Sequence, residues 1–391
     1  MNKLSSTILV CSVLYIGTAL AATSGWRNDG TGRYPDAKPA LKWSKTENVI
    51  WKKPLSKESN ASPTVVKDRL FICQDPETLI CISSLDGSNI WQATLDWDAL
   101  SGGKSRPSKH NDTGYSTPTP LSVGDNVYVV FGSGIAAAFD LDGKQIWAKI
   151  VGSPTHEWGH SASPVFADNK IFVHMDNKLM ALDPKSGKTL WTAPSLSFWG
   201  SPLPLEFGTR HAILTPGGDI IRTLDGKIVA KAVAEMPWTS PIVEERVVYV
   251  IDEKGATAFR LPTRLPLQLK VERLWSAQAK KDRYYASSVY HEGLLYNVTK
   301  GGFLVVLDAS TGETVYEKRL PLSGNVYPSP CLAGEHLIVT SSSGKMVVIK
   351  PGRTYTEVAQ NMLEGMRSCP TFDGNRMYVR TFNHLYCIGP E

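Results

Sequence analysis

Residues 181–191 read Ala-Leu-Asp-Pro-Lys-Ser-Gly-Lys-Thr-Leu-Trp: an apolar-Asp segment, a glycine turn and a tryptophan. The same order of features occurs in residues 84–91, Ser-Leu-Asp-Gly-Ser-Asn-Ile-Trp, and in residues 139–147, Phe-Asp-Leu-Asp-Gly-Lys-Gln-Ile-Trp. A glycine turn between two apolar or β-branched runs predicts a pair of antiparallel strands. Because the unit recurs, we expect a fold built from repeats.

A second repeated feature is a small residue followed by proline, or a close variant. It recurs at intervals of roughly forty to fifty residues, the usual length of a propeller blade. Its copies are Ser62-Pro63, Thr117-Pro118, Ser163-Pro164, Ser201-Pro202, Ser240-Pro241, Ser287-Ser288, Ser329-Pro330 and Cys369-Pro370. The pattern predicts an all-β, eight-bladed β-propeller of four-stranded antiparallel blades. Seven blades remain the alternative, because residues 223–229 lack the tryptophan and residues 349–352 shorten another repeat.

A ring of blades must join the two ends of the chain, since an isolated blade exposes open edges and apolar faces. The last repeat, residues 369–388, supplies about three strands, and Val49-Ile50-Trp51 has the composition of a fourth. We therefore expect residues 22–391 to form one domain in which this N-terminal strand completes the last blade. The repeated Trp91, Trp147 and Trp191 are expected to be structural and to pack at blade junctions.

The segment from Ala181 to Trp191 resembles the Ala-x-Asp-x-x-x-Gly-Lys-x-x-Trp docking motif of pyrroloquinoline-quinone (PQQ)-repeat propellers. Residues 26–32 and 43–51 are similar to those of exported bacterial proteins of this family whose role is uncharacterised, and the likeness covers nearly the whole chain after residue 21. More distantly, the chain resembles the outer-membrane assembly propeller lipoproteins. The resemblance implies the fold but no single reaction, because such propellers include both quinone-dependent dehydrogenases and scaffolds.

The first 21 residues predict a signal peptide, with Lys3, an apolar run from Ile8 to Leu20 and the small residues of Ala19-Leu20-Ala21. Val10 before Cys11 argues against a lipid-modification site. We expect an exported protein, periplasmic or secreted, since no later stretch is long and apolar enough for a transmembrane helix. The net charge of +5 is too small to indicate nucleic-acid binding. We further expect a monomer.

Enzymatic function is the alternative that the family resemblance raises. Quinone-dependent dehydrogenases resemble one another in their greater length, an adjacent Cys-Cys pair and a calcium site, and this sequence has no Cys-Cys pair. It also has no Asp/Asn-rich loop of the kind that calcium requires. We therefore predict no catalytic residues, no metal and no cofactor, with pyrroloquinoline quinone as the cofactor of the enzymatic alternative. A quinone- or metal-dependent oxidoreductase remains the alternative function.

His156-Glu157-Trp158-Gly159-His160 matches the His-Glu-x-x-His pattern of zinc proteases, which places both imidazoles on one helix face. Pro154 before the motif and Gly159 within it make a helix improbable here. The cysteines leave two interpretations open. Cys73 and Cys81 flank a turn and could form a disulfide across a hairpin, or both could be buried free thiols.

The position three residues before each repeated proline, or its equivalent, is rich in aromatic side chains. In a propeller the first strand of each blade lines the central channel, so this position should fall on one channel mouth in every blade. These residues either wedge between blades or form a ligand-binding rim, where nearby histidines would help to orient a polar ligand. The rim hypothesis names Tyr115, Trp199, Trp238, Tyr285, Tyr327, Arg367, His156 and His160.

Residues 98–111 form an insertion rich in Gly, Ser and basic residues between the first two blades, and we expect a loop that could cover the same mouth. The function that these features favour is non-catalytic binding or scaffolding by an exported propeller. The expected partner is an envelope protein, a peptide or a polysaccharide.

Overall fold

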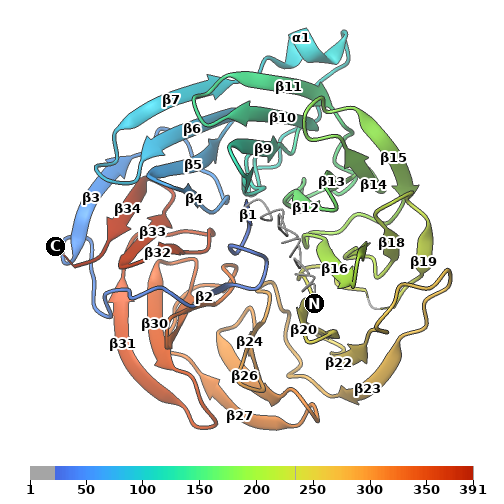
Figure 1. The fold of residues 1–391 in the computed structure, drawn as a ribbon. Helices are drawn as coiled ribbons and strands as arrows, with labels where there is room; N and C mark the ends of the chain where they lie inside the picture. The colour runs from blue at the N-terminus through green and yellow to red at the C-terminus, as the bar shows by residue number, and fades with distance from the viewer. Residues whose placement is uncertain (1–22, 234, 391) are drawn as a thin grey trace, which may run out of the picture.

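The computed structural model describes residues 23–233 and 235–390, and within them the chain forms an eight-bladed β-propeller (Figure 1). The predicted signal peptide lies outside the described residues. Each blade is an antiparallel sheet whose first strand lies nearest the central axis and whose fourth strand lies at the outer edge. The fold predicted from the repeats is therefore confirmed, with eight blades rather than seven.

The first four blades run in chain order around the ring. Their strands are β4 (Thr64–Val66), β5 (Arg69–Gln74), β6 (Thr78–Ser83) and β7 (Asn89–Thr94); β8 (Leu121–Val123), β9 (Asn126–Val130), β10 (Ile135–Asp140) and β11 (Gln145–Ile150); β12 (Val165–Ala167), β13 (Lys170–Met175), β14 (Lys178–Leu182) and β15 (Thr189–Pro194); and β16 (Leu203–Phe207), β17 (Arg210–Leu214), β18 (Ile220–Arg222) and β19 (Ile228–Ala230). A short helix, α1 (Trp97–Ser101), follows the first blade.

The last four blades continue the ring and use one strand from the beginning of the chain. Their strands are β20 (Ile242–Glu244), β21 (Val247–Asp252), β22 (Gly255–Arg260) and β23 (Glu272–Ala277); β24 (Val289–His291), β25 (Leu294–Val298), β26 (Phe303–Asp308) and β27 (Thr314–Arg319); β28 (Cys331–Ala333), β29 (His336–Thr340), β30 (Lys345–Lys350) and β31 (Thr356–Met362); and β32 (Thr371–Asp373), β33 (Arg376–Arg380), β34 (His384–Ile388) and β3 (Val49–Pro54).

The ring closes through β3, which pairs antiparallel with β34 and forms the outer strand of the eighth blade. Trp51 lies opposite Cys387 in this ladder. The two ends of the chain therefore share one sheet, and the edge that β34 would otherwise expose is paired.

The hydrophobic core lies between neighbouring blades. The second and third strands of most blades are buried on both faces, because a blade packs on each side of them. Outer strands such as β7 and β27 contain only exposed and half-buried residues. One core cluster, for example, joins Tyr128 and Val130 of the second blade to Ile171 and Val173 of the third. Stacking of neighbours thus buries what a single blade could not.

Tryptophans of the outer strands join one blade to the next. Each indole Nε1 donates to a backbone carbonyl of the following blade over 2.8–3.1 Å, and each ring lies against a turn glycine of that blade. The tryptophans are Trp51, Trp91, Trp147, Trp191 and Trp275. The three predicted docking residues thus lie at blade junctions, and two further residues share their role.

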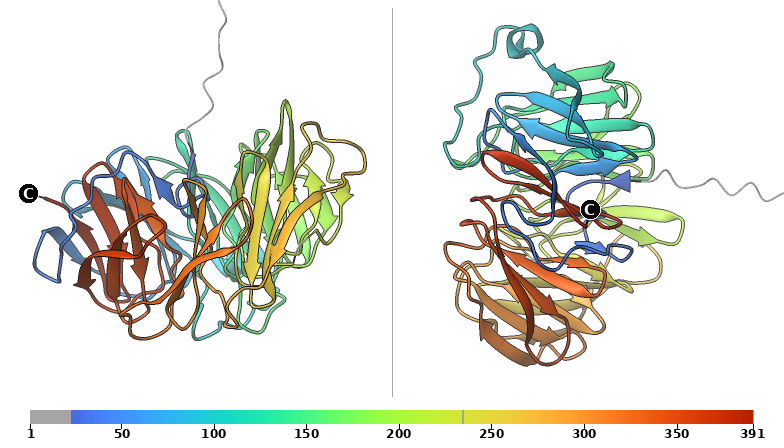
Figure 2. Two further views of the ribbon diagram at one scale, coloured as in Figure 1. Left: turned by 90° about the horizontal axis from the view of Figure 1, so that it is seen from below. Right: turned by 90° about the vertical axis from the view of Figure 1, so that its left-hand side faces the viewer.

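The N-terminal segment crosses the central channel. β1 (Thr23–Ser24) pairs with β8 of the second blade, and β2 (Arg33–Tyr34) pairs in parallel with β28 of the seventh (Figure 1). The side view places β1 on the opposite face from the loop that follows α1 (Figure 2). The segment that joins β1 to β2 therefore connects the second blade to the seventh.

Two cysteines considered for a disulfide are free. Cys73 and Cys81 lie on neighbouring strands β5 and β6, but Cys73 is opposite Leu79 and Cys81 is opposite Phe71. The disulfide alternative is therefore wrong, because the strand register does not pair the two residues. All five cysteines of the described residues are buried free thiols. Within the same residues, no helix is both long and apolar enough to cross a membrane.

Candidate functional site

A belt of hydrogen bonds encircles the axis at the repeated small-residue position. The backbone N–H of each member donates to the side-chain oxygen or sulfur of the next, over 2.8–3.2 Å, and the last N–H returns to the first member. We call this set the axial belt: Ser62, Thr119, Ser163, Ser201, Ser240, Ser287, Ser329 and Cys369. The repeated choice of a small hydroxyl-bearing residue therefore serves to satisfy a buried N–H in the neighbouring blade.

In the second blade, the residue that occupies the repeated position differs from the one predicted from the sequence. The sequence there contains two candidates, Thr117-Pro118 and Thr119-Pro120, and the predicted repeat used the first. The hydrogen bonds instead place Thr119 in the belt. The residue three positions before the corresponding proline is therefore Thr117 and not Tyr115.

The corrected position lines a cavity of about 230 Å³ at one channel mouth in all eight blades. We call these residues the mouth ring: Asn60, Thr117, Ser161, Trp199, Trp238, Tyr285, Tyr327 and Arg367. Most of the axial belt forms the layer below, and Trp26 from the N-terminal segment lines the same cavity. Trp26 also lines a second, smaller cavity, together with Leu203 and Pro204 of the fourth blade.

Four aromatic side chains of the mouth ring form an unbroken arc over the fourth to seventh blades. Trp199 and Trp238 have ring centroids 5.1 Å apart, Trp238 and Tyr285 5.4 Å, and Tyr285 and Tyr327 5.2 Å. All four side chains are half-buried. They are therefore accessible from the cavity and do not wedge wholly between blades.

Cationic side chains lie beside the arc. The Arg367 guanidinium lies 4.6 Å from the centroid of Tyr327, Arg283 lies 5.9 Å from that of Trp238, and the Lys300 ammonium lies 5.8 Å from that of Tyr285. Cations over ring faces are attracted by the negative π cloud. Arg283 also donates to the Tyr285 hydroxyl over 3.3 Å, which orients that phenol.

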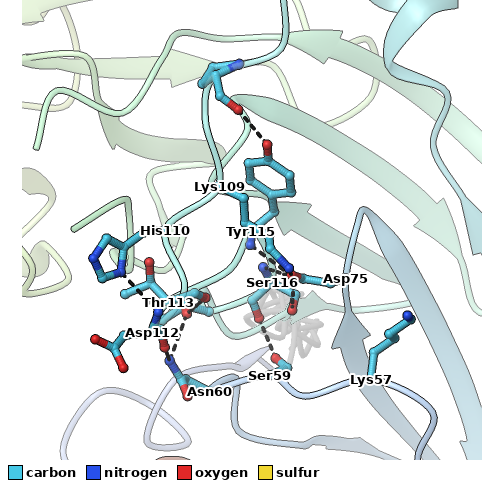
Figure 3. Close-up of polar contacts among 12 residues, drawn as sticks. Lys57, Ser59, Asn60, Asp75, Lys109, His110, Asp112, Thr113, Tyr115 and Ser116 are labelled. Carbon is cyan, nitrogen blue, oxygen red and sulfur yellow. Dashed lines mark hydrogen bonds and ion pairs between the residues drawn. The ribbon is translucent and has the colours of Figure 1, made fainter. Parts of the chain in front are cut away.

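The loop after α1 completes the other half of the mouth. Asp112 of this loop pairs with Arg367 over 3.0 Å. The Asp112 carbonyl accepts from Asn60 Nδ2 over 2.9 Å (Figure 3). Asp112 and Thr113 both line the cavity. The mouth thus has an aromatic half, supplied by four blades, and a polar half, supplied by the remaining blades and this loop.

The base of the loop is tied to the first blade. The Asp75 carboxylate accepts from the N–H groups of Tyr115 and Ser116, each over 3.0 Å, and pairs with Lys109 over 3.3 Å (Figure 3). Nearby, Arg106 pairs over 3.3 Å with the fully buried Glu77, whose pKa is raised by burial. These contacts hold the predicted insertion against the propeller rather than in solvent.

Tyr115 does not belong to the mouth, which corrects the sequence prediction. Its side chain is 7% exposed, and its hydroxyl donates to the Pro107 carbonyl beneath the loop. The cause is the two-residue difference in register between Thr117 and Thr119. Tyr115 packs under the loop, where it also contacts Arg106.

The two histidines predicted for the rim lie in different environments. His156 is exposed and packs edge-on against Trp199, with ring centroids 4.1 Å apart, just outside the cavity. His160 is buried, its Nε2 lies 3.0 Å from the Ala162 carbonyl oxygen, and burial lowers its pKa to about 4. The expectation that His160 joins the rim is therefore wrong. The His-Glu-x-x-His segment is a loop, so the helical geometry of zinc proteases is not formed.

Several mouth residues were missed by the sequence analysis. Trp158 stacks on His110, with centroids 5.4 Å apart, and extends the aromatic arc beyond Trp199. Asp112, Thr113 and Trp26 come from segments outside the repeats, so the repeat spacing could not predict that they line the mouth. Only Thr117 could have been found, by testing the second Thr-Pro pair as the repeat position.

Comparison with protein families identifies two matching propeller models. The model described as outer membrane protein assembly factor BamB matches residues 42–198, and the KIB1-4 β-propeller model matches residues 149–379, more than half of the chain. No curated protein sequence matches the chain significantly.

Many solved structures match this fold, and the three described here share little sequence identity with the chain. BamB from Moraxella catarrhalis superimposes with a TM-score of 0.63 at 14% identity, covering 88% of this chain and 97% of that one. A europium-containing methanol dehydrogenase gives 0.65 at 12% identity, covering 94% and 98%. The computationally designed Ika8 protein gives 0.62 at 10% identity, covering 90% and 100%.

These neighbours include both an assembly factor and an enzyme, and at such identities they show the fold alone. The repeats, the ring of eight blades and the family matches agree. The chain belongs to the PQQ-like, BamB-type family of β-propellers.

Proposed function

We propose that this protein is an exported, non-catalytic binding protein that holds a segment of a partner protein at its channel mouth. The observation that carries the proposal is the arc of Trp199, Trp238, Tyr285 and Tyr327 around an open cavity. Tryptophan, tyrosine and arginine are the residues that dominate protein-binding hot spots, and here all three types share one concave surface. The predicted leader supports an envelope partner, as does the family match to an assembly factor.

The chemistry of the mouth favours a peptide segment with aromatic or apolar side chains next to acidic ones. The arc offers ring edges and faces for apolar contact. Arg283 and Lys300 at its edge are exposed or half-buried cations, and the ion-pair partner of Arg283, Glu253, is 3.9 Å away. An acidic group of the partner would thus find a cation directly beside its apolar contact.

The test is binding of the labelled full-length protein to an immobilised array of peptides that vary in acidic and aromatic content. We expect binding to acidic-aromatic peptides, weakened at least tenfold in the double variant Trp199→Ala/Trp238→Ala, since each hot-spot residue contributes about 2 kcal/mol or more. The matched control is Leu224→Ala/Leu267→Ala, which truncates two exposed apolar side chains outside the mouth.

Three outcomes would overturn the proposal. Equal peptide binding by the tryptophan variant would place recognition elsewhere. Binding to a glycan array instead of peptides, lost in the same variant, would make the ligand a polysaccharide. Tight binding of added pyrroloquinoline quinone, followed by its absorbance and by substrate oxidation, would favour the oxidoreductase alternative.

A further inference from the structure

Arg367 is the one charged member of the mouth ring. Its side chain is 23% exposed, and its guanidinium lies 4.6 Å from the centroid of the Tyr327 ring, at one end of the aromatic arc. Its Nε is buried and has no hydrogen-bond partner among the described residues. The side chain of Arg283, at the edge of the arc, is 55% exposed. Water therefore screens Arg367 less than Arg283, and Arg367 attracts an anion at the mouth more strongly.

Both Nη atoms of Arg367 contact Asp112 of the loop after α1. Nη2 donates to Oδ1 of the carboxylate over 3.0 Å, and Nη1 donates to the backbone carbonyl over 3.1 Å. The guanidinium thus contacts one carboxylate oxygen and does not form the bidentate pair that its planar fork allows. The Asp112 side chain is 49% exposed, and an ion pair open to water contributes little to stability. Another carboxylate can therefore replace Asp112 at small cost.

Other contacts than the Asp112 carboxylate hold the loop. Asp75 accepts from two backbone N–H groups at the base of the loop, and Arg106 pairs with the buried Glu77. The Asp112 carbonyl has a second donor, Asn60 Nδ2, at 2.9 Å. The Asp112 side chain points away from Asp75 (Figure 3). Rotation of this side chain would therefore free the guanidinium while the loop stays in place.

A second cavity adjoins the ion pair. Asp112 and Arg367 line the mouth cavity and also this cavity, which has a volume of about 420 Å³. Two lysines, Lys57 and Lys109, line the second cavity as well. A displaced Asp112 side chain would thus have room to turn and cationic groups close to its carboxylate, so its release from Arg367 would not leave an isolated charge.

We propose that Arg367 is the subsite for a carboxylate group of the ligand, and that Asp112 occupies this subsite in the free protein as an internal competitor. The inference rests on the proposed function, because the carboxylate is the acidic group of the bound peptide segment. On binding, the ligand carboxylate accepts from both Nη atoms of Arg367, and the Asp112 carboxylate turns away. An aromatic group beside the ligand carboxylate packs on Tyr327. The mouth therefore selects segments in which an acidic group stands next to an aromatic ring.

The test compares phenylacetate with phenylacetamide, which has a similar shape and no charge. Dissociation constants for the folded, full-length protein are measured by ligand-observed NMR. We expect Asp112→Asn to bind phenylacetate about threefold more tightly than the parent protein does, because the variant lacks the competing exposed ion pair. Phenylacetamide should bind equally to both proteins. The matched control is Asp125→Asn, which removes the carboxylate of an exposed ion pair with Lys67 outside the mouth and should bind both compounds like the parent protein.

Arg367→Gln removes the cation and should lose the preference for phenylacetate over phenylacetamide. A preference that persists in Arg367→Gln would overturn the proposal. So would a phenylacetate affinity of Asp112→Asn no higher than that of the parent protein, or no phenylacetate binding at all. Tighter binding of both compounds by Asp112→Asn would also overturn it, since that result indicates a wider cavity rather than a freed cation.

These results are independent of the peptide array that tests the proposed function. If no peptide binds while phenylacetate follows the expected order, the proposed function is wrong and the carboxylate subsite is supported. If acidic-aromatic peptides bind while Asp112→Asn has the phenylacetate affinity of the parent protein, the internal competitor alone is wrong.

Discussion

At the scale of single residues, the repeated tryptophan makes the same two contacts at each junction that contains it. Trp147 shows both: its Nε1 donates to the Pro184 carbonyl over 2.9 Å, and its ring occupies the space above Gly187, where a Cβ atom would come within 2.6 Å. Gly187 also has a φ of +66°, so the docking motif needs glycine for two reasons.

Replacing Trp147 tests its structural role. Trp147→Ala should lower the free energy of unfolding by about 3–5 kcal/mol, because the side chain is 9% exposed and its loss leaves a cavity. Trp147→Phe should cost less, since it keeps most of the ring volume and loses one hydrogen bond of about 1 kcal/mol. The unfolding free energies of both variants are to be measured by chemical denaturation. Trp158→Ala, at a residue 47% exposed, is the control and should change stability little.

Buried histidines set an acid limit on stability. Burial lowers the pKa of His160 and of His174 to about 4, and both side chains are enclosed. In the unfolded chain these groups take up protons near pH 6.5, so between about pH 6.5 and about pH 4 the unfolded state binds more protons than the folded state. Stability should therefore fall as the pH falls through this window.

The measurement is the melting temperature at several pH values in that range. His174→Phe removes one of the two groups, so its melting temperature should depend less steeply on pH than that of the parent protein. An unchanged dependence would show that other groups govern the acid transition. His291→Phe is the control, because that histidine lies in β24 and is partly exposed.

At the scale of elements, the loop after α1 is the part of the mouth that does not repeat. Arg106 in this loop pairs with Glu77 and lies over the rings of Trp97 and Tyr115, with centroid distances of 5.8 Å to each. The Glu77 side chain has no exposed surface, so removal of its cationic partner would leave a buried carboxylate alone.

Arg106→Met should therefore loosen the loop. We expect faster backbone hydrogen exchange in residues 102–114, a lower melting temperature and no change in the exchange of β13 or β14. Lys104→Met, at an exposed position in the same loop, is the control, and its backbone hydrogen exchange should equal that of the parent protein. Protection equal to that of the parent in Arg106→Met would mean that Asp75 and its partners alone hold the loop.

At the scale of the whole molecule, the axial belt joins all eight blades in one closed circuit. Ser240→Ala removes the acceptor of the Ser201 N–H, a contact of 2.8 Å in the buried interior. An unsatisfied buried N–H should cost about 1–3 kcal/mol in unfolding free energy. Ser240→Thr, which keeps the hydroxyl and copies the residue type of the second blade, should cost less. Equal losses in both variants would indicate packing rather than the hydrogen bond.

The sequence by itself determined the repeat and therefore the propeller. Its glycine turns, tryptophans and small-residue-Pro pairs are local patterns, and each blade requires the same local chemistry. The aromatic positions Trp199, Trp238, Tyr285 and Tyr327 followed from the same regular spacing. In the second blade both Thr117-Pro118 and Thr119-Pro120 fit the interval between repeats, so the spacing did not identify the correct pair. Tyr115 was therefore wrongly predicted to lie at the channel mouth.

Only the tertiary structure decided what the non-repeating segments do. The ladder between β3 and β34 joins residues from opposite ends of the chain. The pairing of Asp112 with Arg367 likewise depends on how a loop folds back over a distant blade. Such contacts have no period along the chain, because ring closure rather than local spacing brings these residues together.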